Sequence, residues 1–128
     1  MFRIPWNRPA TKEERDAFLI ACLRNRLIEN QRRQAVEEAW RQELELVRRT
    51  GEGTVQWTRE QKRELFDRGK VSGYVGHHQN SVSLFPEQAW NPNNIVFRTP
   101  QEHFAEHNFN WRIPTMSFQP VNRTPWIK

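Results

Sequence analysis

The stretch from Ala10 to Thr50 contains neither glycine nor proline, and this feature constrains the fold more than any other. A capping box opens the stretch, because Thr11 is followed three residues later by Glu14. We expect a long amphipathic helix or a pair of helices, with a bend or break in the polar run 29–34. An unbroken helix would be about 55 Å long, which exceeds the width of the remaining domain. Apolar residues recur at helical spacing: Phe18, Leu19, Cys22, Leu23, Leu27, Val36, Ala39, Trp40, Leu44 and Val47.

The chain is short enough to be one domain, or a small core with an appendage. Residues 1–50 are expected to hold an extended leader, with Pro5 and Pro9, and then the long helix or helix pair. Residues 51–128 are expected to form the core, with a basic tail at the C-terminus. A charged amphipathic helix usually covers a core, and the alternatives are a connection to a parent chain or an arm along DNA.

Capping and turn signals predict the elements after residue 50. The run 58–61 is a second capping box and indicates a short helix to about Arg68. Strands are expected over 70–75 and 95–98, on either side of the long loop 79–93. A third capping box begins at Thr99, with proline at the first helical position, and predicts a final helix. The sequence therefore predicts an α+β fold.

All four histidines lie between residues 77 and 107. His103 and His107 are four apart on the predicted final helix, so both side chains project from one face and suit a single metal ion. His77 and His78 are neighbours in an extended segment and point to opposite sides, so one can bind metal while the other faces substrate as a base. Three imidazole ligands leave a position open for water, as in catalytic sites. The alternatives are surface histidines or a structural metal site.

Asn94 stands at the start of the second predicted strand. Its amide is expected to brace the loop that carries the histidine pair or to orient the scissile phosphate. An ordinary turn asparagine is the alternative.

A net charge of +5 and a pI of about 10.1 favour a polyanionic partner such as nucleic acid. The tail after His107 has no acidic residue, and it either lies along a phosphate backbone or packs on the core, with packing favoured. The single cysteine, Cys22, excludes an intramolecular disulfide and a cysteine-based zinc finger. No apolar run is long enough to span a membrane. The tail contains Trp111, Arg112, Arg123, Trp126 and Lys128.

The histidines, Asn94 and the Thr99–Pro100 pair together resemble the HNH nuclease motif on a ββα-metal fold. More specifically, the segments 73–78, 86–87 and 92–95 resemble the GHH toxin domains of the HNH/endonuclease VII superfamily, found at the C-termini of Rhs and other polymorphic toxins. The segment 57–74 and the helix before it also resemble the C-terminal toxin-like region of teneurins, where the histidine pair is typically lost. The resemblance covers about residues 35–107.

The resemblance implies a role for each matching residue. His78 would be the general base, and Asn94 would support the loop or the phosphate. One divalent ion is expected, with zinc, nickel or manganese favoured by imidazole ligands and magnesium still possible. Arg98 and Arg112 are expected to contact nucleic acid. The metal ligands would be His77, His103 and His107.

The resemblance also implies a metal-dependent endonuclease that acts as the C-terminal toxin of a secreted Rhs-type effector, with double-stranded DNA as the expected substrate. An RNase, or an inactive toxin-like binding module, is the alternative. An acidic immunity protein and the parent Rhs-type chain are the expected partners. The toxin is expected to act in the cytoplasm of a target cell and to stay bound to its immunity protein in the cytoplasm of the producer.

Overall fold

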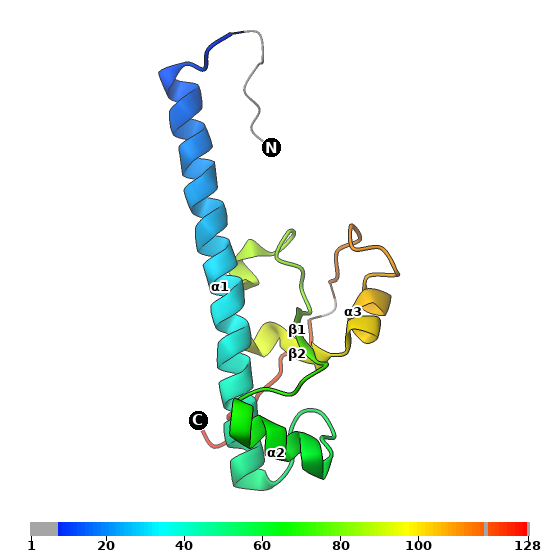
Figure 1. Cartoon of the computed structure of the whole chain (residues 1–128). Helices are drawn as coiled ribbons and strands as arrows, with labels where there is room; N and C mark the ends of the chain where they lie inside the picture. The colour runs from blue at the N-terminus through cyan, green and yellow to red at the C-terminus, as the bar shows by residue number, and fades with distance from the viewer. Residues whose placement is uncertain (1–7, 117, 128) are drawn as a thin grey trace.

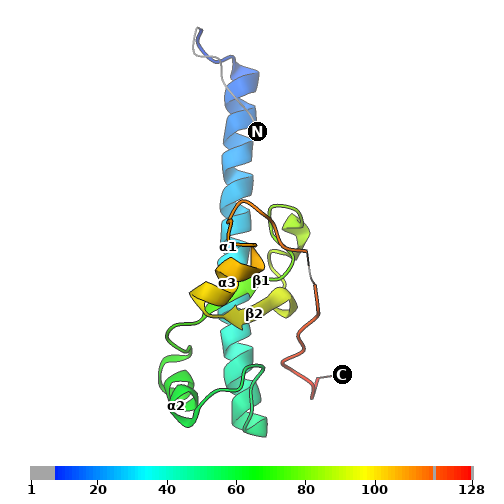
Figure 2. The same cartoon turned by 90° about the vertical axis from the view of Figure 1, so that its right-hand side faces the viewer.

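A computed structural model describes residues 8–116 and 118–127. Residues 1–7, which make up most of the predicted leader, and Lys128 lie outside the described residues. The fold is α+β, as predicted, with a small two-stranded sheet between the long helix and the last helix (Figures 1 and 2). Within the described ranges, no helix combines the length and apolarity needed to cross a membrane. The elements in chain order are α1 (Lys12–Thr50), α2 (Arg59–Arg68), β1 (Val75–His78), η1 (Pro86–Gln88), η2 (Pro92–Asn94), β2 (Ile95–Arg98) and α3 (Pro100–Glu106).

The helix α1 is continuous, so the prediction of a bend or break at residues 29–34 was wrong. The polar run consists of residues that tolerate a helix interior, and it is bridged by a contact of 2.9 Å between Arg32 and Glu29. The width of the core does not limit the helix, because the N-terminal half of α1 projects beyond the rest of the molecule (Figure 1). Gly51 ends the helix with a left-handed φ of 84°.

The C-terminal half of α1 carries the hydrophobic core. Its buried face packs against β2, and the ring of Trp40 stacks on Phe97 with 3.8 Å between ring centroids. Trp57 joins this aromatic group and meets Tyr74 edge-on at 4.8 Å. Burial of these rings supplies much of the core of a small domain.

The two strands are antiparallel, and His77 and His78 pair with Val96 and Ile95. The prediction for β2 was correct, but the first strand was placed at residues 70–75 and instead begins at Val75. Two features keep the preceding residues out of the strand. Gly73 has a φ of 83°, and the Glu64 carboxylate accepts hydrogen bonds from the backbone N–H and hydroxyl of Ser72.

Gly76 is the point of closest approach between β1 and α1. A Cβ atom at Gly76 would lie 2.8 Å from Cγ1 of Val36 on α1 and 3.2 Å from Cγ2 of Ile95. Only a residue without a side chain allows the strand to lie this close to the helix.

The C-terminal segment packs on the core, in agreement with the favoured prediction. The Arg123 guanidinium is fully buried and donates to Oε2 of Glu43 at 3.1 Å and to the Ile95 carbonyl at 2.7 Å. The Arg49 guanidinium lies 4.3 Å from the ring centre of Trp126. The tail therefore ties α1 to β2.

Candidate metal centre

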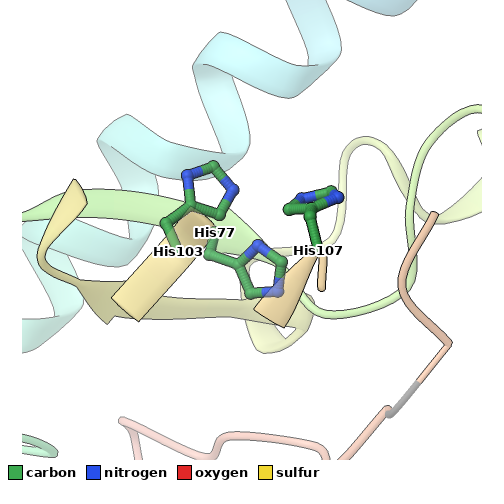
Figure 3. A group of neighbouring side chains, drawn as sticks. All are labelled: His77, His103 and His107. Carbon is green, nitrogen blue, oxygen red and sulfur yellow. The ribbon is translucent and has the colours of Figure 1, made fainter. Parts of the chain in front are cut away.

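Three histidines from two elements meet beside the sheet. The strand β1 supplies His77, α3 supplies His103, and His107 is the C-cap residue directly after α3 (Figure 3). One nitrogen of each ring lies within 4.8 Å of the others. The centroid of the His77 ring is 4.6 Å from that of His103 and 5.6 Å from that of His107. The structure thus brings together the three residues that were predicted from the sequence to be metal ligands.

Two of the three rings have one nitrogen fixed by a hydrogen bond, which leaves the other nitrogen of each ring as the candidate ligand atom. Nδ1 of His107 lies 2.7 Å from the Ile113 carbonyl oxygen, and Nε2 of His77 lies 2.7 Å from Oε2 of Glu106. Both acceptors require an N–H donor, so the ring hydrogen is on that nitrogen. The lone pairs of Nε2 of His107 and Nδ1 of His77 remain available to a metal ion.

The pKa values favour neutral, metal-binding rings. Burial, with contributions from His103 and His107, lowers the pKa of His77 to about 3. Burial also lowers the pKa of His103, to which His107 adds. Ligation needs an unprotonated imidazole, so near neutral pH no proton has to leave these rings. Imidazole nitrogens are ligands that divalent transition-metal ions accept.

Glu106 is a functional residue that sequence reasoning missed. Its two carboxylate oxygens accept from different partners, Oε2 from His77 and Oε1 from Nε of Arg98 at 2.5 Å. Arg98, which was expected to contact nucleic acid, donates to this carboxylate, and its expected role stays a prediction. The available signal was an acidic residue directly before His107, in the last turn of the same helix.

His78 lies on the opposite face of β1 and is buried. Its Nε2 donates to the Ala89 carbonyl at 3.0 Å, which leaves the lone pair on Nδ1 to accept a proton. Burial lowers the pKa of His78, and the bond to Ala89 opposes this shift. The neutral form of the ring is therefore the one present near neutral pH.

Asn94 braces the loop that follows β1. Its side chain is fully buried, and its amide both donates to the Asn80 carbonyl at 3.1 Å and accepts from the Asn80 N–H at 2.9 Å. Both polar ends are used and shielded from solvent, so of the two predicted roles the geometry favours loop support over phosphate contact. This geometry supports a positioning role for Asn94, and its part in catalysis stays a prediction.

A pocket of about 520 Å³ opens over the histidines. One wall is the middle of α1, with Arg24 and Arg32, and the other is the loop with Trp111 and Arg112. Arg112, which was expected to contact nucleic acid, lines this pocket, and the contact itself stays a prediction. Sequence reasoning did not place Arg24 or Arg32 at the site, because nothing local shows that α1 passes it. His77, His78, His103 and His107 all border the pocket.

Comparison with known proteins places this site in a family. Residues 23–99 match the sequence model of the GHH signature containing HNH/Endo VII superfamily nuclease toxins. The match includes His77, His78 and Asn94 and ends before His103.

The chain is also similar to teneurins. It is 42% identical to mouse (Mus musculus) teneurin-3 over 77 residues and 36% identical to teneurin-m of Drosophila melanogaster over 75 residues. These alignments cover 60% and 59% of the chain but only 3% of each teneurin. The family match spans more than half of the chain and includes the histidine pair, as the resemblance of the sequence predicted. The chain therefore belongs to the GHH-signature nuclease toxins of the HNH/Endo VII superfamily.

Proposed function

We propose that the protein is a metal-dependent endonuclease that hydrolyses phosphodiester bonds in DNA. The observation that carries the proposal is the arrangement of four histidines around one pocket. Three of them form a ligand cluster and the fourth, His78, presents a free Nδ1 lone pair. A structural metal site would have no use for the fourth histidine or for the arginines around it.

In this mechanism His78 acts as the general base. Its Nδ1 takes a proton from a water molecule, whose oxygen bonds to phosphorus while the bond to the 3′ oxygen breaks. The Ala89 carbonyl fixes the tautomer that makes this transfer possible. A divalent ion held by His77, His103 and His107 would stabilise negative charge on the phosphate and the leaving oxygen. The leaving oxygen and the protonated base exchange protons with solvent.

The charge distribution supports a nucleic-acid substrate. The net charge is +5, and the described lining of the pocket includes three arginines and one glutamate. The lining residues do not select DNA over RNA by themselves, so both substrates belong in the test.

We further propose that the domain is the toxic part of a larger secreted protein of the Rhs type. It would act in the cytoplasm of a target cell. An acidic immunity protein would cover the basic pocket in the producer cytoplasm. The family description as a nuclease toxin and the much greater length of the teneurins support this proposal. A neighbouring reading frame that encodes an acidic protein without affinity for this domain would count against it.

Cleavage of supercoiled plasmid tests the nuclease. Magnesium, manganese, nickel and zinc are added singly to metal-stripped protein, with EDTA and His78→Ala as controls and a structured RNA as second substrate. Glu13→Gln, an exposed change outside both the pocket and the family match, is the matched active control. We expect metal-dependent nicking by the wild type and Glu13→Gln and loss of it in His78→Ala. Folded, metal-loaded protein that cuts neither substrate would favour an inactive binding module, as the teneurin similarity allows.

A further inference from the structure

An exposed tryptophan stands at the rim of the histidine cluster. The side chain of Trp111 is 57% exposed, although its ring centroid lies only 4.8 Å from that of His103 and 5.1 Å from that of His107. A core role does not explain a large ring that stays in solvent next to polar groups. A free aromatic face beside a reaction centre suits a flat apolar ligand, such as a nucleobase.

The loop that carries Trp111 is fastened to the metal centre. Asn108 and Phe109 both have left-handed backbone conformations, with φ of 52° and 56°, which asparagine tolerates but which are unfavourable for phenylalanine. The hydrogen bond between His107 and the Ile113 carbonyl holds the far end of the loop. The position of the tryptophan is therefore set relative to the ligands and not left to a free loop.

The opposite wall of the pocket is cationic. Arg24, Ile28 and Arg32 are spaced by four residues, lie on one face of α1 and line the pocket. Arg32 contacts Glu29 at 2.9 Å, but both side chains are largely exposed, so this pair is weak and a phosphate can replace it. A guanidinium is well suited to bind phosphate oxygens.

We propose that these two walls form a channel for a single nucleic-acid strand. Arg24 and Arg32 bind backbone phosphates, and Trp111 stacks on an unpaired base next to the bond that is cut. The inference rests on the proposed nuclease function and specifies the form of its substrate.

The dimensions of the pocket support a single strand. A volume of about 520 Å³ is that of a small-ligand pocket, which has room for nucleotides of one strand. A base inside a duplex has both faces covered by its neighbours, so it reaches Trp111 only after unstacking, which costs energy. Single strands and distorted sites in DNA avoid this cost.

Binding in EDTA tests the channel independently of cleavage. Fluorescence anisotropy gives the Kd for a labelled single strand and for the same strand in a duplex. We compare Trp111→Ala with Trp90→Ala, because Trp90 is 58% exposed and lies outside this pocket. We compare Arg32→Ala with Arg33→Ala, a neighbour that does not line the pocket. Circular dichroism confirms that each variant is folded.

We expect the single strand to bind more tightly than the duplex, and Trp111→Ala to weaken single-strand binding about tenfold while Trp111→Phe restores most of it. Arg32→Ala should weaken binding and reduce the slope of log K against log salt by about 0.7, whereas Arg33→Ala should leave the slope unchanged. Equal affinity for duplex and single strand, or equal behaviour within either matched pair, would overturn the channel. The plasmid assay tests nuclease activity separately, since a protein can bind single strands as expected and still fail to cut them.

Discussion

Nε2 of His77 on β1 lies 2.7 Å from Oε2 of Glu106 on α3. This contact joins the strand and the helix that together supply the three candidate ligands. The other oxygen of the same carboxylate accepts from Arg98 at the end of β2, so one side chain connects all three elements of the ββα unit. The carboxylate of Glu106 therefore fixes the ring of His77, one of the three candidate ligands, relative to both strands and the helix.

Replacing Glu106 should weaken metal binding without unfolding the domain. Partners that orient a ligand histidine typically contribute 10- to 100-fold in metal affinity, so Glu106→Ala should raise the Kd for zinc by about that factor. Glu106→Gln keeps an acceptor for His77, so its Kd for zinc should lie between those of Glu106→Ala and the wild type. Competition with a chelating dye measures the Kd, and Glu87→Ala is the exposed control. Unchanged affinity in Glu106→Ala would show that the carboxylate does not orient the ligand.

Metal should stabilise the fold through the histidine cluster. An ion present at 100 times its Kd raises the free energy of unfolding by about 2.7 kcal/mol, which differential scanning fluorimetry detects as a higher Tm. We expect zinc to raise the Tm of metal-stripped wild type and of His78→Ala. His107→Ala should lose most of the shift, because it removes a ligand. A shift of the same size in His107→Ala would place the ion elsewhere.

Removing the amide of Asn94 should destabilise the loop after β1. Asn94→Ala leaves the backbone N–H and carbonyl of Asn80 without their partner, at a cost of about 1–3 kcal/mol for each buried group left unpaired. Chemical denaturation should show a clear loss of stability together with a loss of cleavage. Asn93→Ala, an exposed neighbour, is the control, and its unfolding midpoint should change far less.

The buried pair between Arg123 and Glu43 should be essential for stability. Arg123→Met leaves the carboxylate of Glu43 buried without its charged partner, which costs about 3–5 kcal/mol. Arg48→Met removes an exposed partner of Glu45 and should have no measurable effect. Urea denaturation of both variants provides the comparison. A small effect of Arg123→Met would mean that Thr54 and Trp57, which also donate to Glu43, are sufficient.

The metal-free protein should lose stability as the pH falls from 7 to 5. Burial lowers the pKa of His77 to about 3, below its ordinary 6.5, so the unfolded chain binds the extra proton in this range. Well above pH 6.5, His77 is unprotonated in both the folded and the unfolded chain and does not change the free energy of unfolding. As the pH falls from 6.5 to 5, protonation of His77 in the unfolded chain lowers this free energy by about 1 to 2 kcal/mol. Urea unfolding in EDTA measures this slope, and His77→Asn should reduce it, while the lowered pKa values of His78 and His103 account for part of what remains. The lowered pKa values of Glu14 and Glu45 affect stability only at lower pH.

Local signals in the sequence were sufficient to predict most of the helices and strands and the clustering of the histidines. All three predicted capping boxes form, and β2 and α3 begin where predicted, because capping depends on residues three positions apart. The start of β1 was misplaced since the contact between Glu64 and Ser72, which shapes the preceding turn, is tertiary. The spacing of His103 and His107 is a local signal, and it predicted a metal centre. Glu106 and Arg32 were missed. Their roles depend on which distant elements meet.

The contact between Gly76 and Val36 gives the first letter of the GHH signature a meaning apart from catalysis. An alanine there would push the strand off the helix, and the two histidines that follow would move with it. The glycine of the signature thus allows close packing of the strand on the helix, and the two histidines carry the proposed chemistry. Any design that transplants the ββα unit into another scaffold must bring along the stretch of α1 around Val36 or rebuild an equally flat support beneath the glycine.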